Sequence, residues 1–234
     1  MRSASSTLLS CPLCPCGEGA VFHKDRLRVY YKCPICSLIF VDPQNYVSEE
    51  AEKEEYCLHE NNIEDDGYRA FLSRAAQPVF DFFAESEDKR IGLDFGCGPA
   101  PVLASILTSN DTKFSVVNYD KYFFPATQED IFSHDNQYDF ITSTEVVEHL
   151  HSPGTVLKSL WRVLKPGGIL VIMTKRAEGS VAKFQNWHYI RDKTHVCFFS
   201  DATFEWIAQT LFSAQEKKIT PFFHGKDVVS FVKL

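Results

Sequence analysis

A short run with two glycines, between a strand-like and a helix-like segment, constrains the fold of this chain more than any other feature. The run Asp94-Phe95-Gly96-Cys97-Gly98 follows an apolar stretch and precedes a helical pattern. Glycines at these positions let the backbone approach a ligand without a clash from a Cβ atom. A nicotinamide-binding loop would carry Gly or Ala three residues after Gly98, but Pro101 stands there. The pattern therefore favours a cationic ligand with an amino-acid end over a pyrophosphate.

The segments around this run alternate between strand-like and helix-like patterns. Helical patterns separate four apolar runs, at 90–95, 114–119, 138–142 and 168–174. Strands that alternate with helices predict an α/β fold with a doubly wound, mostly parallel sheet. Two later extended stretches, 217–223 and 227–234, suit an antiparallel hairpin at the edge of that sheet.

An acidic residue follows the second apolar run. Asp120 lies 22 residues after Gly98, where a carboxylate can hydrogen-bond both hydroxyls of a ribose. With the glycine run, Asp120 resembles the nucleoside site of class I S-adenosylmethionine-dependent methyltransferases. The run Leu164-Lys165-Pro166-Gly167-Gly168 before a strand is a second hallmark of that family. Ala100-Pro101 departs from the family pattern, in which Gly and then Thr or Ser are common, and this affects the expected shape of the loop.

The resemblance covers roughly residues 86–234. It implies a Rossmann-like sheet of seven strands and S-adenosylmethionine as cofactor, with the glycines under the methionine part and an acidic residue at the ribose. The whole chain also resembles a narrower group of such enzymes that begins with a zinc ribbon and carries Gly67-Tyr68, Trp187-His188-Tyr189 and Asp192-Lys193-Thr194-His195. The cofactor-binding residues that these resemblances imply are Asp94, Phe95, Gly96, Gly98, Asp120, Lys121, Thr144, Glu145 and Tyr68.

Four cysteines near the start of the chain have the spacing of a metal site. Cys11-x2-Cys14 and Cys33-x2-Cys36 are separated by eighteen residues, and the segment between them alternates like a hairpin strand. This spacing is typical of zinc ribbons, in which four thiolates hold a structural zinc ion. Cys16 could replace Cys11 or Cys14 as a ligand. The sequence thus divides into a zinc ribbon (1–45), an acidic helical linker or lid (46–85) and a cofactor-binding domain (86–234).

A cluster of ionisable residues follows the third apolar run. On a helix, Glu145, Glu148 and His149 would project from one face, and with His195 as first choice or His188 as second they could hold a divalent ion. This set resembles the metal site of methyltransferases that act on the 2′-hydroxyl of small-RNA ends. Without a metal, His149 or His195 would act as general base. The candidate catalytic residues are Glu145, His149, His195, His188 and Asp192.

Charge and composition limit the classes of function that the chain can have. Nine acidic residues and one lysine lie between positions 46 and 66, so the rest of a chain with net charge −7 is nearly neutral, which argues against a general nucleic-acid binder. No signal peptide or membrane span is visible, and a cytoplasmic protein without a membrane partner is expected. We expect a methyltransferase that modifies oxygen on a small molecule, with or without a divalent metal. The alternatives are a macromolecular substrate, either an RNA end or a protein, and a non-catalytic adaptor that senses S-adenosylmethionine. The sequence does not specify an oligomeric state.

Overall fold

A computed structural model describes residues 8–15, 17–58, 63–125, 128–213 and 218–234. Its larger sheet has the strand order β10-β11-β8-β7-β5-β6, with β5 to β8 parallel to one another and β11 antiparallel to β8. The hairpin predicted at the sheet edge is formed by β10 and β11. The strands are β5 (Arg90–Phe95), β6 (Phe114–Tyr119), β7 (Tyr138–Thr144), β8 (Leu164–Met173), β10 (Phe222–His224) and β11 (Val228–Val232).

The predicted count of seven strands differs from the six that the described residues form in this sheet. Between β6 and β7 the described residues form an isolated bridge from Asp120 to Phe124 and the short helix α4 (Gln128–Ile131). The described part of this connection therefore adds no strand to the sheet.

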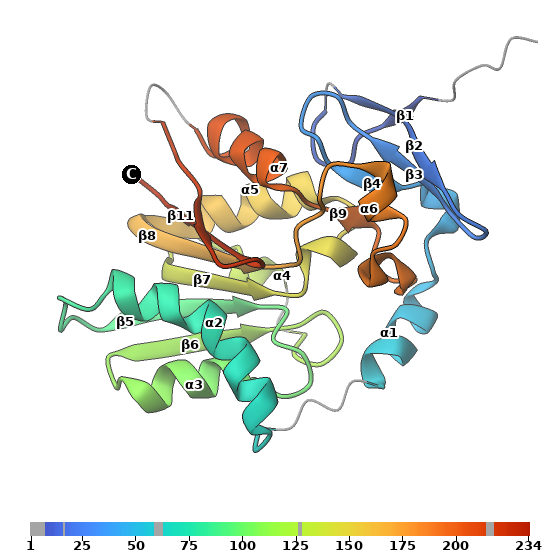
Figure 1. Cartoon of the computed structure of the whole chain (residues 1–234). Helices are drawn as coiled ribbons and strands as arrows, with labels where there is room; N and C mark the ends of the chain where they lie inside the picture. The colour runs from blue at the N-terminus through green and yellow to red at the C-terminus, as the bar shows by residue number, and fades with distance from the viewer. Residues whose placement is uncertain (1–7, 16, 59–62, 126–127, 214–217) are drawn as a thin grey trace, which may run out of the picture.

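Helices cover both faces of this sheet, as predicted for a doubly wound fold (Figure 1). Helices α2 (Asp66–Phe82) and α3 (Val102–Asn110) pack on one face, against Ile169, Val171 and Met173 of β8. Helices α5 (Pro153–Val163) and α7 (Asp201–Trp206) pack on the other face, where Leu170 and Ile172 point. Successive side chains of a strand face opposite sides, so the unbroken apolar run of β8 serves both layers.

A second, antiparallel sheet contains the predicted ribbon hairpin, β2 and β3. Its strand order is β1-β2-β3-β4-β9, and the last strand comes from a segment far from the other four in the sequence, after the parallel strands of the larger sheet. Ile39 pairs with Phe198, and Phe40 pairs with Cys197. The strands are β1 (Leu9–Ser10), β2 (Glu18–Lys24), β3 (Val29–Lys32), β4 (Ile39–Val41) and β9 (Cys197–Phe198).

The two sheets share one hydrophobic core. Leu13 and Phe40 of the N-terminal region belong to the same buried cluster as Leu93 and Leu170 of the larger sheet. The first cysteine turn rests on the start of α5, where a Cβ atom on Gly154 would lie 2.5 Å from the carbonyl oxygen of Leu13. Such a close approach requires glycine, and it fixes the N-terminal region against the rest of the chain.

The remaining helical elements lie mostly around the carboxyl ends of the parallel strands. Helix α1 (Glu49–Cys57) begins at Ser48, whose hydroxyl accepts from the N–H of Ala51, and it stands at the right of Figure 1. The others are η1 (Pro43–Asn45), η2 (Val147–His149), α6 (Val181–Phe184), η3 (His188–Arg191) and η4 (Ile207–Leu211).

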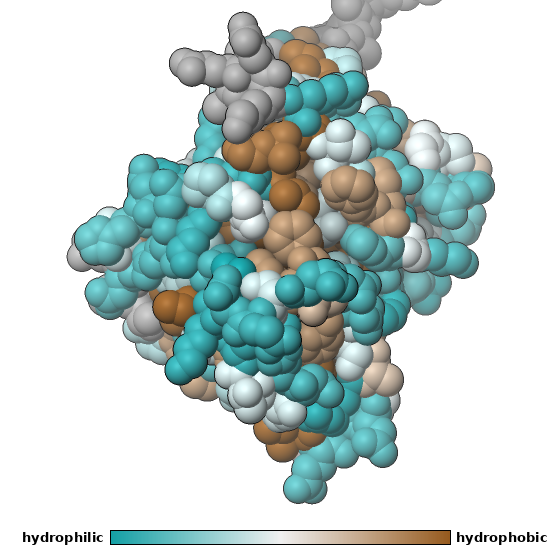
Figure 2. Space-filling view, turned by 90° about the vertical axis from the view of Figure 1, so that its left-hand side faces the viewer, coloured by the Kyte–Doolittle hydropathy of each residue, from teal (hydrophilic) through white to brown (hydrophobic). Residues whose placement is uncertain are grey.

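The side of the molecule away from α1 is mainly hydrophilic. Figure 2 shows this face with one narrow band of hydrophobic atoms running down its middle, bordered by hydrophilic residues. Across the described ranges, each helix is too short or too polar to cross a membrane.

Candidate active site

A cavity of about 740 Å³ opens at the carboxyl ends of β5, β6 and β7. This volume is within the range of small-molecule sites, and the carboxyl edge is where open α/β sheets bind ligands. Glu52 and Tyr56 from α1, Tyr68 from α2, and Asp192 and His195 from the loop before β9 complete its wall.

The glycine run forms the floor on one side. Gly96 and Gly98 have φ values of +82° and +68°, in the left-handed region that favours glycine. A Cβ atom on Gly96 would lie 2.2 Å from Cγ2 of Val146. The N–H groups of Gly96 and Cys97 both donate to the carbonyl oxygen of Tyr119, at 2.7 and 3.0 Å. The loop is therefore tied to the tip of the neighbouring strand.

The Asp120 side chain is hydrogen-bonded to the same loop. Its Oδ2 accepts from the N–H of Gly98 at 3.1 Å, and its Oδ1 accepts from the N–H groups of Tyr122 and Phe123 at 2.8 and 3.1 Å. A carboxylate has about four acceptor sites, so three backbone donors leave room for roughly one ligand hydroxyl. The sequence predicted that the Asp120 carboxylate binds a ribose. In the structure it also accepts hydrogen bonds from the backbone of its own turn.

Asp94 lies beneath the loop and is not among the residues that line the cavity. It is 2% exposed, and its Oδ1 accepts from the hydroxyl of Thr142 at 2.9 Å. Burial raises the pKa of Asp94 to about 7. Burial, with the nearby charge of Asp94, also raises the pKa of Tyr68 to about 12. The other residues predicted to contact the cofactor all line the cavity: Tyr68, Phe95, Gly96, Gly98, Asp120, Lys121, Thr144 and Glu145.

The prediction that one helix carries Glu145, Glu148 and His149 is wrong. Strand β7 ends at Thr144, and the N–H of Glu145 still donates to the carbonyl oxygen of Met173 at 2.8 Å. Glu145 then has a φ of +53°, which turns the chain into the short 3-10 helix η2. A non-glycine residue in this region is strained and requires support from its surroundings. The two glutamates therefore reach the site from different elements.

Tyr189 joins the two glutamates, a role that the sequence did not reveal. Its hydroxyl donates to Oε1 of Glu148 and lies 3.3 Å from Oε2 of Glu145 and 3.1 Å from Oγ1 of Thr174. Burial is the main reason that the pKa of Glu145 is raised to about 7 and that of Glu148 to about 8. Oε1 of Glu145 and Oε2 of Glu148 are buried and have no hydrogen-bond partner among the described residues.

His195 faces this group from the loop before β9. Its Nδ1 lies 2.8 Å from the carbonyl oxygen of Tyr189, so Nδ1 carries the proton and donates, and Nε2 is left with its lone pair. Nε2 lies 3.6 Å from Oδ2 of Asp192. The His149 and His195 rings are 4.6 Å apart. Burial lowers the pKa of His195, which favours the neutral ring.

The structure brings together three of the four residues proposed for a second metal. One ligand atom from each of Glu148, His149 and His195 lies within 4.8 Å of the others. Glu145 stands beside this group and is not part of it. The alternative ligand His188 is exposed, and its Nε2 lies 2.9 Å from Nζ of Lys175, outside the cavity lining.

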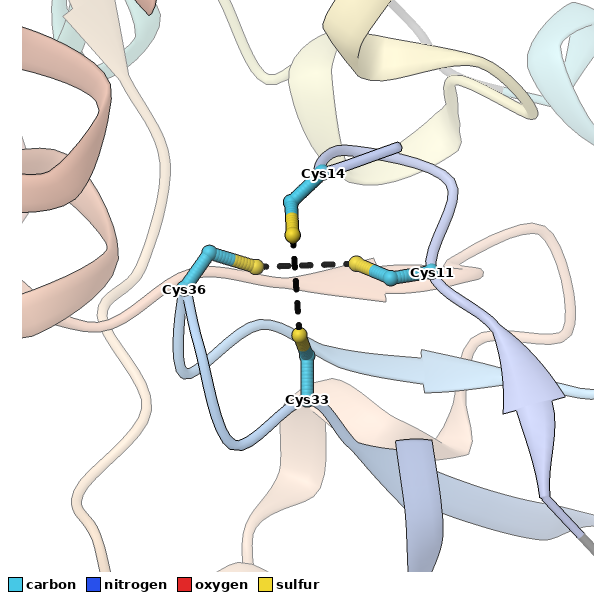
Figure 3. A group of neighbouring side chains, drawn as sticks. All are labelled: Cys11, Cys14, Cys33 and Cys36. Carbon is cyan, nitrogen blue, oxygen red and sulfur yellow. Dashed lines mark hydrogen bonds between the residues drawn. The ribbon is translucent and has the colours of Figure 1, made fainter. Parts of the chain in front are cut away.

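The four predicted zinc ligands also come together (Figure 3). Cys11 and Cys14 lie on one turn and Cys33 and Cys36 on another, all buried, with Sγ atoms 3.5 Å apart for Cys11 and Cys36 and 4.0 Å apart for Cys14 and Cys33. The alternative ligand Cys16 lies outside the described residues.

The fold and the cavity at the strand tips define a methyltransferase-like α/β protein. A family model described as a methyltransferase domain matches residues 68–211, more than half of the chain. The chain belongs to this methyltransferase-domain family. The match begins inside α2 and ends at the last residue of η4, so it includes every cavity-lining residue except those from α1.

Individual relatives match over shorter stretches. The chain is 33% identical over 76 residues to the uncharacterized protein YafE of Escherichia coli and 30% identical over 99 residues to the ubiquinone biosynthesis O-methyltransferase of Caulobacter vibrioides. These matches cover 31% and 35% of this chain and 36% and 39% of the two relatives, well under half of each. An O-methyltransferase family protein from Burkholderia thailandensis has a similar fold, with a TM-score of 0.50 and 12% identity over 78% of this chain and 62% of that one.

Proposed function

We propose that this protein is an S-adenosylmethionine-dependent methyltransferase that transfers the methyl group to an oxygen atom of a small molecule, assisted by a divalent metal. The observation that carries the proposal is that one cavity is lined both by the glycine loop with Asp120 and by His149 and His195, whose ring nitrogens lie close to the buried Glu148 carboxylate. A methyl donor bound at the glycine loop and a methyl acceptor bound beside the two histidines would be neighbours.

The residues on the donor side fit S-adenosylmethionine. When bound, this cofactor supplies a methyl group on a positively charged sulfur atom. Gly96 and Gly98 leave space over the loop, Asp120 offers an acceptor to a ribose hydroxyl, and the Tyr68 ring covers the pocket from α2. The Glu145 carboxylate, when ionised, would compensate the charge of the sulfur. Much of the rate enhancement in such a site comes from aligning the reacting atoms.

The donor set on the acceptor side fits a divalent metal. One carboxylate and two imidazoles are ligands for several first-row ions and leave positions open for substrate oxygens. The buried Oε2 of Glu148, without a hydrogen-bond partner in the described structure, is the unsatisfied atom that such an ion would engage. A bound ion would act as a Lewis acid that lowers the pKa of a substrate hydroxyl. The hydrogen bond from Nδ1 of His195 to the backbone fixes the ring and leaves the Nε2 lone pair available to such an ion.

The charges around the cavity favour a neutral or cationic small molecule over an RNA end. Lys121 is the only Lys or Arg among the described lining residues, and its Nζ lies 2.8 Å from Oε1 of Glu49. Four carboxylates line the same space: Glu52, Asp120, Glu145 and Asp192. Since proteins bind RNA and DNA backbones mainly through Lys and Arg, such a lining disfavours phosphates.

A metal-free reaction is the second candidate, favoured by the protonation state of His195. Because the Nδ1 proton is held by a backbone carbonyl and the ring is neutral at physiological pH, Nε2 can accept a proton from a substrate hydroxyl. Asp192 lies beside Nε2 and would stabilise the resulting cation. Burial raises the pKa of Asp192, but two hydrogen bonds from Thr194 help to outweigh it, so the net shift is downward and the carboxylate is ionised.

We also propose that the four cysteines bind structural zinc in a ribbon within residues 1–45. Tetrahedral zinc with Zn–S distances of about 2.3 Å places its sulfur atoms roughly 3.8 Å apart, close to the 3.5 and 4.0 Å separations of the paired Sγ atoms. Residues 46–85 would then form a linker and lid, a role supported by Glu52 and Tyr56 in the cavity wall, and 86–234 the cofactor-binding domain.

Incubation with a labelled methyl donor and fractionated cell extract tests the function directly. Label in small molecules supports the proposal, label in RNA or protein supports the macromolecular alternative, and cofactor binding without any transfer supports the sensing adaptor. Repeating the successful reaction after chelation, and after adding back Mg²⁺, Mn²⁺, Fe²⁺ or Zn²⁺, separates the two mechanisms. Full turnover in chelator with the ribbon zinc retained would leave only the general-base route.

A further inference from the structure

One arginine of the N-terminal hairpin binds the backbone of the segment that carries Asp192 and His195. Arg28 lies between β2 and β3 and is only 7% exposed. Its Nε donates to the hydroxyl of Tyr30 at 3.1 Å. Its Nη1 and Nη2 donate to four backbone carbonyl oxygens within residues 190–195: His195 at 2.9 Å, Asp192 at 3.0 Å, Lys193 at 3.3 Å, and Ile190. All five N–H groups of the guanidinium therefore have acceptors.

The loop that Arg28 holds has little structure of its own. It follows the four-residue helix η3 and leads into the two-residue strand β9. Three of its carbonyl groups, with that of Ile190 in η3, converge on the guanidinium. This same loop carries Asp192 and His195 into the cavity. Four of the five hydrogen bonds of this buried cation go to these carbonyl groups, with the Asp25 carboxylate nearby, so most of its partners are kept only while the loop keeps this path.

We propose that Arg28 is a positioning residue for the methyltransferase site, through which the N-terminal ribbon fixes His195. The inference rests on the proposed function, because it assigns the purpose of Arg28 to that site. Two backbone hydrogen bonds of the next residue, Val196, complete the arrangement. The N–H of Val41 donates to the carbonyl oxygen of Val196 at 2.9 Å, and the N–H of Val196 donates to the carbonyl oxygen of Glu148 at 2.8 Å.

The guanidinium is suited to this task in a way that lysine is not. Its rigid planar fork directs five donors at fixed angles, whereas an ammonium group has three donors on a flexible stem. Asp25 fixes both Arg28 and Tyr30. Its Oδ1 accepts from the backbone N–H of Arg28 at 2.7 Å, and its Oδ2 accepts from the hydroxyl of Tyr30 at 2.8 Å. The ribbon is thus part of the active-site scaffold, in addition to any contact it makes with substrate.

Histidine NMR tests the inference without requiring methyl transfer. The full-length protein is labelled at its eight histidines, and the His195 ring signal is assigned with His195→Gln. Arg28→Gln, Arg28→Lys and the control Arg26→Gln are then compared, together with affinity for S-adenosylmethionine by calorimetry. Arg26 is exposed on the same turn and has no hydrogen bond to the loop in the described part of the chain, so it controls for loss of a positive charge.

We expect Arg28→Gln to shift the His195 signal and Arg28→Lys to shift it less, while Arg26→Gln leaves it unchanged. Cofactor affinity should stay within about twofold in all three variants, because Gly96, Gly98 and Asp120 do not contact Arg28. An unchanged His195 signal in Arg28→Gln, or an equal shift in Arg26→Gln, would overturn the inference. If Arg28→Gln does not fold, Arg28→Lys decides: a shifted signal supports the inference and an unchanged one refutes it. If the parent protein fails to bind S-adenosylmethionine, the proposed function fails while the His195 comparison still decides the role of Arg28.

Discussion

The hydroxyl of Tyr189 donates a hydrogen bond to Oε1 of Glu148, a carboxyl group with no exposed surface. The two residues lie 41 positions apart and come from η2 and η3. This bond fixes one oxygen of Glu148, while the other, Oε2, is buried without a hydrogen-bond partner among the described residues. The geometry of the candidate metal site therefore depends on a phenol that is itself outside the ligand set.

Tyr189→Phe removes that donor and leaves a buried carboxyl group with one fewer partner. We expect the free energy of unfolding to fall by about 1–3 kcal/mol, the usual cost of an unsatisfied buried polar group. Urea denaturation measures this change. Tyr31→Phe, at a buried tyrosine of β3 whose hydroxyl has no hydrogen bond to the described residues, is the control and should cost less than about 0.5 kcal/mol. Equal losses in the two variants would contradict the prediction.

Gly96→Ala should disrupt the cofactor side. The new methyl group would lie 2.2 Å from Val146, at a φ of +82° that alanine rarely adopts. We expect a loss of stability of about 1–3 kcal/mol and a marked loss of affinity for S-adenosylmethionine. The matched control is Gly179→Ala, since a Cβ atom there would meet nothing within 4 Å. Thermal unfolding and calorimetry of both variants provide the comparison, and a stable, cofactor-binding Gly96→Ala protein would refute the proposed loop.

Asp120→Ala removes the acceptor for three backbone N–H groups and for the ligand. We expect cofactor affinity to fall by about 10- to 100-fold, equivalent to roughly 1.4–2.8 kcal/mol. Asp94→Ala should also weaken binding, through the loss of the buried support beneath the loop. Exposed Asp88 provides the control substitution Asp88→Ala. Calorimetry that gives parental affinity for Asp120→Ala would contradict the assignment of the site.

The raised pKa values of Glu145 and Glu148, about 7 and about 8 against an ordinary 4.5, predict how stability depends on pH in metal-free protein. The folded state holds these protons more tightly than the unfolded chain. Their contribution to stability is therefore fully present below about pH 4.5 and is lost as the pH rises through 7 and 8. Glu148→Gln, which is neutral at every pH, should lose less stability than the parent between about pH 5 and pH 8. Denaturation at several pH values tests this, with exposed Glu55→Gln expected to follow the parent.

The zinc content of the purified protein tests whether the four cysteines bind a structural zinc ion. The purified parent protein should contain about one zinc ion per chain, as a four-thiolate site requires. Cys33→Ser should lose most of it and unfold at lower temperature, because the ribbon shares its core with the larger sheet. Cys57→Ser, at an exposed cysteine, should keep both zinc and stability. Metal analysis after gel filtration distinguishes these outcomes, and a zinc-free parent would remove the zinc proposal.

The sequence by itself determined the features that depend on local spacing. The two close cysteine pairs, the run from Asp94 to Gly98 and the alternation of strands with helices are patterns within short windows. Residues close in sequence are constrained by the same backbone geometry, so their spacing predicts turns, strands and helices. The α/β architecture and the ribbon hairpin followed from such patterns.

Only the tertiary structure decided the features that join distant parts of the chain. The pairing of Phe40 with Cys197, the hydrogen bonds of Arg28 to the His195 loop and the bond between Tyr189 and Glu148 link segments far apart in sequence. The expected helix at Glu145 gave way to a left-handed turn, because the N–H of Glu145 bonds to the neighbouring strand. Local propensity cannot specify contacts of this kind, since their free energy arises only when the packed core brings the partners together.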